Sequence, residues 1–135
     1  MNIKDLADKY NLSKSDFWEM KFGGKSNWII THDAVEKIAD IEKIDFHLPQ
    51  VFRDTNSNVA MMGEATKGEK RVWSTGESSS FNNKNPYNWA MAEKRLKDRL
   101  TLKIINAYGV RAEAYLIMYL MIDQVIRNFV YVIVY

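Results

Sequence analysis

The feature that most constrains this chain is a long helical pattern with one basic edge, over residues 88–109 (NWAMAEKRLKDRLTLKIINAYG). The pattern contains no internal proline or glycine, Asn88 can cap its start, and Gly109 stands where a helix can end in the left-handed conformation. At about 100° per residue, the apolar residues form one stripe that must face a core, and a basic row runs beside it at every fourth position. The stripe comprises Trp89, Ala92, Leu96, Leu100, Ile104 and Ala107, and the basic row comprises Arg95, Arg99 and Lys103.

Positive charge is concentrated around this helix. Residues 84–103 contain six basic and two acidic residues, a net charge of +4, whereas the whole chain carries +2. A total of +2 is too small to indicate a nucleic-acid partner, but its clustering is what a protein needs to hold a polyanion. The chain has no cysteine, which excludes disulfides and thiolate metal sites, and its first residues lack the apolar run of a signal peptide. We expect a cytoplasmic protein with one domain, in which residues 1–109 form the α+β body and residues 110–135 an apolar extension.

Helical signals dominate the chain before residue 44. Apolar residues at helical spacing, with capping residues in front of them, mark the helices. We expect a helix over residues 3–10 that ends near Asn11, a second helix that begins at Ser13 or Ser15, an extended segment over residues 27–30, and a helix over residues 31–43 with Asp33 and Glu36 as a capping box.

Between residues 44 and 75 the pattern changes to strands. Ile44, Phe46 and Leu48 alternate with polar residues, as in a half-buried strand. Turn formers separate this segment from apolar runs over residues 59–65 and 71–75. We therefore expect a three-stranded antiparallel β-meander packed on the long basic helix, a β-β-β-α core, with a polar loop over residues 76–86 between them.

The segment after residue 109 is apolar but does not suit a membrane. Asp123 and Arg127 would each cost about 2.5–3.5 kcal/mol in the middle of a bilayer. We expect a mostly buried helix over residues 112–128 and a strand-forming run over residues 129–135. In this extension Ile117, Leu120 and Val132 should be protected in the core or at an interface between subunits.

Residues 73–109 (WSTGESSSFNNKNPYNWAMAEKRLKDRLTLKIINAYG) resemble a group of phage-encoded recombination proteins, the Sak-type single-strand annealing proteins. In that group a strand that ends in Gly-Glu passes through an Asn-rich loop into a helix of the type AMAEKRxKDRxxLK. The resemblance covers roughly residues 17–109 and is strongest over residues 90–99. The outline is also similar to the core of the ring-forming annealing mediator of eukaryotes, here through Glu93, Lys94, Lys97 and the pair Tyr108 and Gly109. After residue 109 the chain departs from the acidic segment that is usual in the phage proteins.

The resemblance implies a nonenzymatic homo-oligomer that binds single-stranded DNA in a basic groove and anneals strands in phage recombination or replication. The walls of this DNA-binding groove would comprise Lys94, Arg95, Lys97, Arg99 and Lys103 from the helix, and Lys67, Lys70 and Arg71 from the second hairpin. Arg95 and Arg99 have no acidic partner four residues away, so we expect them to bind DNA, and their reversal to glutamate should leave the fold intact. For Lys94 and Lys97, ordinary pairs with Asp98 and Glu93 are an equal alternative.

Aromatic residues can supply stacking platforms for bases. Phe81 and Tyr87 lie in the polar loop and are the stacking candidates, whereas we expect all four tryptophans in the core.

Two other functions stay open. Glu64, Glu69 and Glu77 near the hairpin would suit a metal-dependent nuclease, but the acid-x-Lys tripeptide of such sites is missing. A metal site can also be drawn at Asp45 with His47 or at His32 with Asp33, although solvated side chains are more common in such pairs. The other alternative is a structural interaction domain. We expect no catalytic residue, no bound metal and no cofactor.

Overall fold

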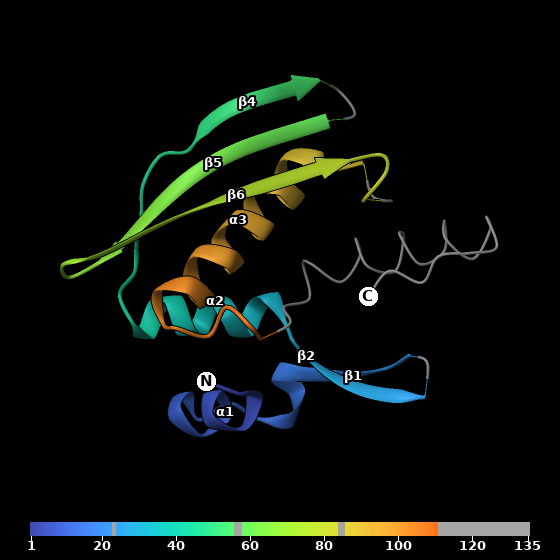
Figure 1. Cartoon of the computed structure of the whole chain (residues 1–135), viewed down its shortest axis with the longest axis vertical. Helices are drawn as coiled ribbons and strands as arrows, with labels where there is room; N and C mark the ends of the chain where they lie inside the picture. Colours follow the sequence, from blue (N-terminus) through green and yellow to red (C-terminus); the bar gives the residue numbers. More distant parts are fainter. Residues whose placement is uncertain (23, 56–57, 84–85, 111–135) are drawn as a thin grey trace.

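The computed structural model describes residues 1–22, 24–55, 58–83 and 86–110. In this part the chain is an α+β protein with three α-helices, one short 3₁₀ turn and two antiparallel sheets (Figure 1). A two-stranded hairpin lies near the N-terminal helix, and a larger sheet packs against the long helix. None of the helices in the described residues is both long enough and apolar enough to span a membrane. The expectations for residues 111–135, with Ile117, Leu120 and Val132, lie outside the described residues.

The first helix forms as expected. Helix α1 (Ile3–Tyr10) is capped by Asn2, whose side chain accepts a hydrogen bond from the backbone N–H of Asp5 at 2.9 Å. It ends at Asn11 in the left-handed conformation, with φ of 52°.

The expected second helix is wrong. Ser13 starts only the 3₁₀ turn η1 (Lys14–Asp16), after which the chain forms a hairpin of strands β1 (Phe17–Phe22) and β2 (Lys25–Ile30). Residues 17–22 form a strand because they pair with β2, and because aromatic residues such as Phe17 and Trp18 favour an extended backbone over a helix.

Helix α2 (His32–Ile41) has its N-cap two residues before the expected cap. The Oγ1 atom of Thr31 accepts a hydrogen bond from the backbone N–H of Ala34 at 3.1 Å, so Thr31 is the N-cap and Asp33 lies inside the helix. The expected capping box of Asp33 and Glu36 is therefore wrong. The hydroxyl of Thr31 caps the helix because it is the first side chain that can accept a hydrogen bond from its unpaired backbone N–H groups.

The larger sheet has four strands in place of the expected three. Its members are β3 (Asp45–Phe46), β4 (Gln50–Thr55), β5 (Asn58–Lys67) and β6 (Lys70–Ser79). Strands β3 and β4 pair with β5, and β6 pairs with β5 over its whole length. The chain leaves the sheet at Pro49, which has no N–H to donate, and Leu48 is almost fully exposed. Strand β6 continues to Ser79, so the segment from Gly76 that was expected to be a loop begins as strand.

Helix α3 (Asn88–Ile104) crosses one face of this sheet (Figure 1). Most of the expected apolar stripe is buried, but Trp89 is half-exposed. The helix approaches the sheet so closely that a Cβ atom on Gly76 would lie 2.2 Å from the carbonyl oxygen of Ala92. The N-cap is Tyr87 rather than Asn88, and the left-handed residue after the helix is Asn106 (φ 61°) rather than Gly109.

Candidate nucleic-acid interface

The basic row of α3 lies along the outer edge of β6. Three of its side chains donate hydrogen bonds to backbone carbonyls of that strand: Arg95 to Glu77 at 2.7 Å, Arg99 to Thr75 at 2.8 Å, and Lys103 to Trp73 at 3.0 Å. These contacts repeat at every fourth residue of the helix and every second residue of the strand. The spacing matches because four helical residues rise about 6.0 Å and two strand residues about 6.6–6.8 Å. The row thus satisfies acceptors on an edge that would otherwise be open to another strand.

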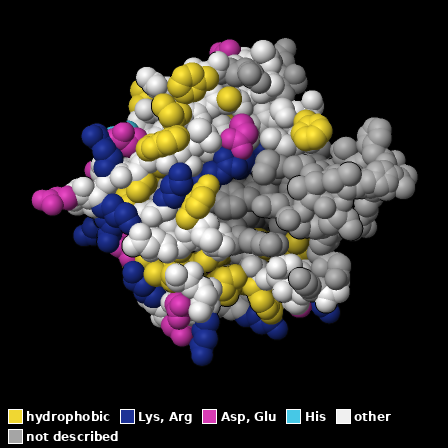
Figure 2. All heavy atoms as spheres, viewed as in Figure 1, with side chains coloured by type: hydrophobic (Ala, Val, Ile, Leu, Met, Phe, Trp, Pro, Cys, Tyr) yellow, Lys and Arg dark blue, Asp and Glu magenta, His cyan; other side chains and the backbone are white. Residues whose placement is uncertain are grey.

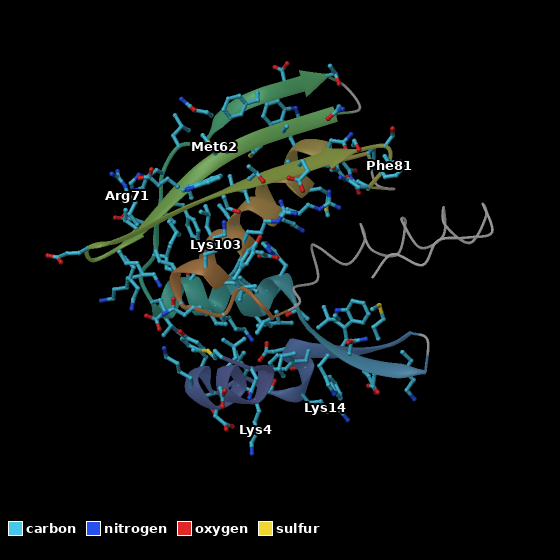
Figure 3. The ribbon with its side chains drawn as sticks, viewed as in Figure 1. Lys4, Lys14, Met62, Arg71, Phe81 and Lys103 are labelled. Atoms are coloured by element: carbon cyan, nitrogen blue, oxygen red, sulfur yellow. The ribbon has the colours of Figure 1, made fainter. Side chains whose placement is uncertain are left out.

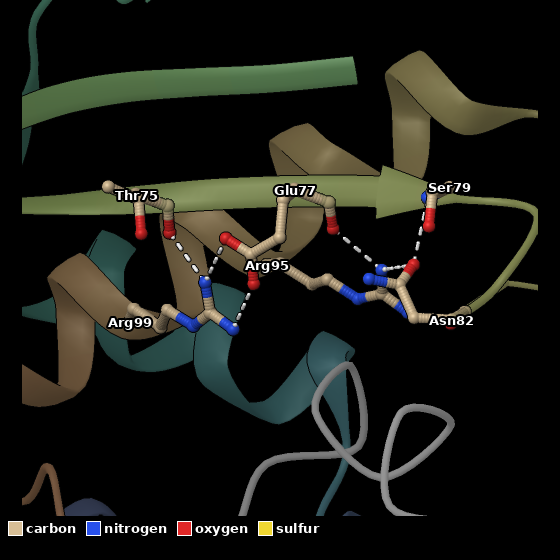
Figure 4. A network of polar contacts seen from close by, with 6 residues as sticks. All are labelled: Thr75, Glu77, Ser79, Asn82, Arg95 and Arg99. Atoms are coloured by element: carbon tan, nitrogen blue, oxygen red, sulfur yellow. Dashed lines mark hydrogen bonds and ion pairs between the residues drawn. The ribbon is translucent and has the colours of Figure 1, made fainter. Parts of the chain in front are cut away.

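Arg95 is part of the fold rather than of the surface. Its side chain is only 1% exposed, and it also donates to the side-chain oxygen of Asn82 at 2.9 Å and to the backbone oxygen of Asn82 at 2.8 Å (Figure 4). The same side-chain oxygen accepts from the backbone N–H of Ser79. Arg95 therefore fastens the loop after β6 to the helix and is not placed to meet a phosphate.

Arg99 is engaged in a similar way. Its guanidinium makes two hydrogen bonds to the carboxylate of Glu77, at 2.8 and 2.9 Å (Figure 4). Burial alone would raise the pKa of the Glu77 carboxyl, but the hydrogen bonds and charge of Arg99, with the charge of Arg95, lower it on balance. As expected, neither arginine has an acidic partner four residues away on the helix. Their partners lie instead on β6 and in the loop that follows it, so the expectation that they are available to bind DNA is not supported.

The other expected lysines of α3, Lys94 and Lys97, lie away from the basic row. Lys97 pairs with Glu93 at 2.8 Å, which is the ordinary alternative, and its ammonium also lies over the ring of Phe46. Lys94 is exposed. Asp98 is buried and its carboxylate lies 2.6 Å from the Nδ1 atom of His32.

The hairpin residues are held by three different parts of the protein. Lys67 pairs with Glu42 at 2.6 Å, Lys70 donates to the carbonyl oxygen of Ile104 at 2.7 Å, and Arg71 pairs with Glu64. The contact of Lys70 fixes the end of the β5–β6 hairpin to the C-terminal end of α3.

This attachment brings basic and aromatic side chains together in one place. The ammonium of Lys103 lies 5.3 Å from the ring centroid of Trp73 and 4.9 Å from that of Tyr108. Both rings reach solvent, with exposed fractions of 62% for Trp73 and 48% for Tyr108. We call this group the Lys103 cluster; it comprises Lys70, Arg71, Trp73, Lys103 and Tyr108. Figure 2 shows hydrophobic and basic side chains side by side on one face of the molecule, and Figure 3 shows Arg71 beside the β5–β6 hairpin and Lys103 at α3.

Trp73 and Tyr108 were missed as candidate binding residues. Expecting every tryptophan in the core is wrong for Trp28, Trp73 and Trp89, each of which is exposed. The alternation of side chains along a strand could have predicted this exposure. It places Trp73 on the same face as Arg71 and Thr75, opposite the residues that face α3. The stacking candidates Phe81 and Tyr87 are exposed as expected. They follow the other end of β6, and Figure 3 shows Phe81 far from Arg71.

The carboxylates do not gather into one site. Glu64 pairs with Arg71 and Glu77 with Arg99, while Glu69 lies at the turn of the hairpin. Within the residues that the structure describes, no three His, Cys, Asp or Glu side chains are grouped so that they could hold a metal ion.

Comparisons with known proteins give no assignment: no family model matches this sequence, and no curated protein or solved structure shows significant similarity to it.

Proposed function

We propose that the protein binds single-stranded DNA through a surface that includes the Lys103 cluster, and that it anneals complementary strands. One observation carries the proposal: two exposed aromatic rings flank a lysine ammonium at the junction of β6 and the end of α3. Proteins that bind single strands combine basic residues along the backbone with aromatic rings on which bases stack.

The chemistry of the cluster favours a single strand over a duplex. A stacked base contributes about 1–3 kcal/mol, and Trp73 offers its ring from a rigid strand rather than from a loop. Bases of a duplex are already stacked on one another and cannot reach the ring without unpairing. Arg71 is exposed beside it, so its positive charge adds to the attraction of the strand.

The annealing activity requires more than one copy. Pairing two long strands needs many subunits on each strand, so we propose a homo-oligomer whose core is formed by the sheet and α3. The resemblance of residues 73–109 to annealing proteins supports this proposal.

A binding assay with two matched tryptophan variants tests the site. Fluorescence anisotropy of a labelled single-stranded oligonucleotide should give an affinity about tenfold weaker for Trp73→Ala, which loses one stacked base. Trp89→Ala is the control, since Trp89 is also half-exposed but lies at the start of α3. Equal affinity of the two variants, or equal binding of a rigid duplex by the wild type, would count against the site. Insensitivity to a chelator is expected, whereas metal-dependent cleavage of the strand would indicate a nuclease.

A further inference from the structure

The face of the sheet opposite α3 contains a hollow of about 590 Å³. The register of the strands explains which side chains surround it, because residues opposite each other in antiparallel strands share a face. Glu64 is opposite Trp73, Met62 is opposite Thr75 and Gln50, and Thr66 is opposite Arg71. The hollow is lined by the side chains of His47, Gln50, Met62, Glu64, Arg71 and Trp73, together with Leu48 and Gly63.

Two charged groups lie side by side in this hollow. The Nε atom of Arg71 contacts the Oε1 atom of Glu64, and the Nδ1 atom of His47 lies 3.7 Å from the same oxygen. His47 is itself oriented by a hydrogen bond between its Nε2 atom and the hydroxyl of Thr66 at 3.1 Å. The carboxylate of Glu64 therefore has a fixed position, while its side chain remains about one third exposed. A ligand in the hollow meets a carboxylate that accepts hydrogen bonds next to a guanidinium that donates them.

We propose that this hollow is a nucleobase subsite that selects guanine within a single strand, an inference that rests on the proposed function. The Watson–Crick edge of guanine presents one acceptor, O6, followed by two donors, N1–H and the 2-amino group. The guanidinium of Arg71 can donate to O6. The Oε1 atom of Glu64 is buried against Arg71 and His47, so the outer oxygen, Oε2, accepts from both N1–H and the 2-amino group. Trp73 supplies the stacking surface, and Met62 the apolar floor.

The other bases fit the same pair less well. Thymine has a carbonyl on each side of its single N–H, so one carbonyl oxygen faces the carboxylate of Glu64. Cytosine presents two acceptors beside its amino group, and adenine presents one acceptor beside its amino group. Each of these arrangements leaves a polar group unpaired or opposite a like charge, which costs free energy in a partly desolvated site. A bidentate contact of this kind discriminates between bases by about 1–3 kcal/mol, so we expect a preference for guanine of about tenfold.

The test uses the full chain and single-base changes in one oligonucleotide. A labelled strand of fifteen thymidines is compared with strands whose central residue is guanosine, adenosine, cytidine or inosine, the last being guanine without its 2-amino group. A single guanine avoids four-stranded structures. We expect the guanosine strand to bind about tenfold more tightly than the all-thymidine strand, and inosine to lose most of that gain. Glu64→Gln should bring the ratio of guanosine to thymidine affinity close to one, whereas Glu69→Gln, at the turn of the same hairpin, should keep it.

The outcomes separate this inference from the function beneath it. Tight, salt-dependent binding of every strand without any preference for guanine would overturn the guanine subsite and leave single-strand binding standing. A preference that inosine retains in full would overturn the role of the Glu64 carboxylate, independently of how any variant folds. Absence of binding to all of the strands would refute both proposals.

Discussion

Replacing Arg95 by methionine should destabilise the protein strongly, although Arg95 looked like a surface residue from the helical pattern. Methionine keeps the length of the side chain but removes the three hydrogen bonds to Glu77 and Asn82. A hydrogen bond from a charged donor contributes about 1.5–3 kcal/mol, and part of the total is offset because the guanidinium no longer has to be kept out of water. We expect the free energy of unfolding to fall by about 3–4 kcal/mol, from a total that is typically about 5–15 kcal/mol.

Urea denaturation followed by circular dichroism measures this loss. With a slope of about 2 kcal/mol per molar urea, the midpoint should fall by about 1.5–2 M. Lys94→Met, on an exposed position of the same helix, should change the free energy by less than about 0.5 kcal/mol. The double reversal of Arg95 and Arg99 to glutamate should unfold the protein, since it sets two new carboxylates beside Glu77. A midpoint for Arg95→Met within 0.5 M of the wild type would show that this network does not hold the loop to the helix.

Two further perturbations test the packing of α3. Gly76→Ala should cost about 3 kcal/mol or more in thermal denaturation, because its Cβ would lie 2.2 Å from the Ala92 carbonyl oxygen, whereas Gly109→Ala meets nothing within 4 Å and should be neutral. Burial alone would lower the pKa of His32, but its hydrogen bond and charge pairing with Asp98, and the charge of Glu36, raise it on balance. The stabilisation is therefore complete below the unfolded pKa of about 6.5 and is lost as the pH rises through the raised pKa, so the melting temperature should fall from about pH 6 to 8. His32→Gln should flatten this dependence; an equal slope in both proteins would rule the pair out as its cause.

Local signals in the sequence predicted part of the fold. Helix α1 and most of α3 follow from apolar periodicity, which acts over a few residues, although the ends of α3 do not fall at the expected caps. Errors arose where a distant partner decides the structure. Residues 17–22 are a strand because they pair with β2. Strand β4 extends into the turn formers Asp54 and Thr55 because β5 offers it an edge.

The candidate site depended even more on distant contacts. The partners of Arg95 and Arg99 lie on β6 and in the loop after it, well before the helix in the chain, so a search four residues along the helix could not find them. Lys103 was identified from the basic row, but its aromatic neighbours were not. Trp73 was assigned to the core by its size, although the alternation along β6 placed it on the polar face.

The dependence of affinity on salt tests the central claim most directly. On a single strand, log K should fall linearly with log salt, with a slope of about 0.7 for each phosphate neutralised. Lys103→Gln should reduce that slope by about 0.7. Lys94→Gln removes the same charge from the same helix, nine residues away and hence on its opposite side, and should leave the slope unchanged. A flat dependence for the wild type, or the same reduction in both variants, would contradict binding of single-stranded DNA at the Lys103 cluster.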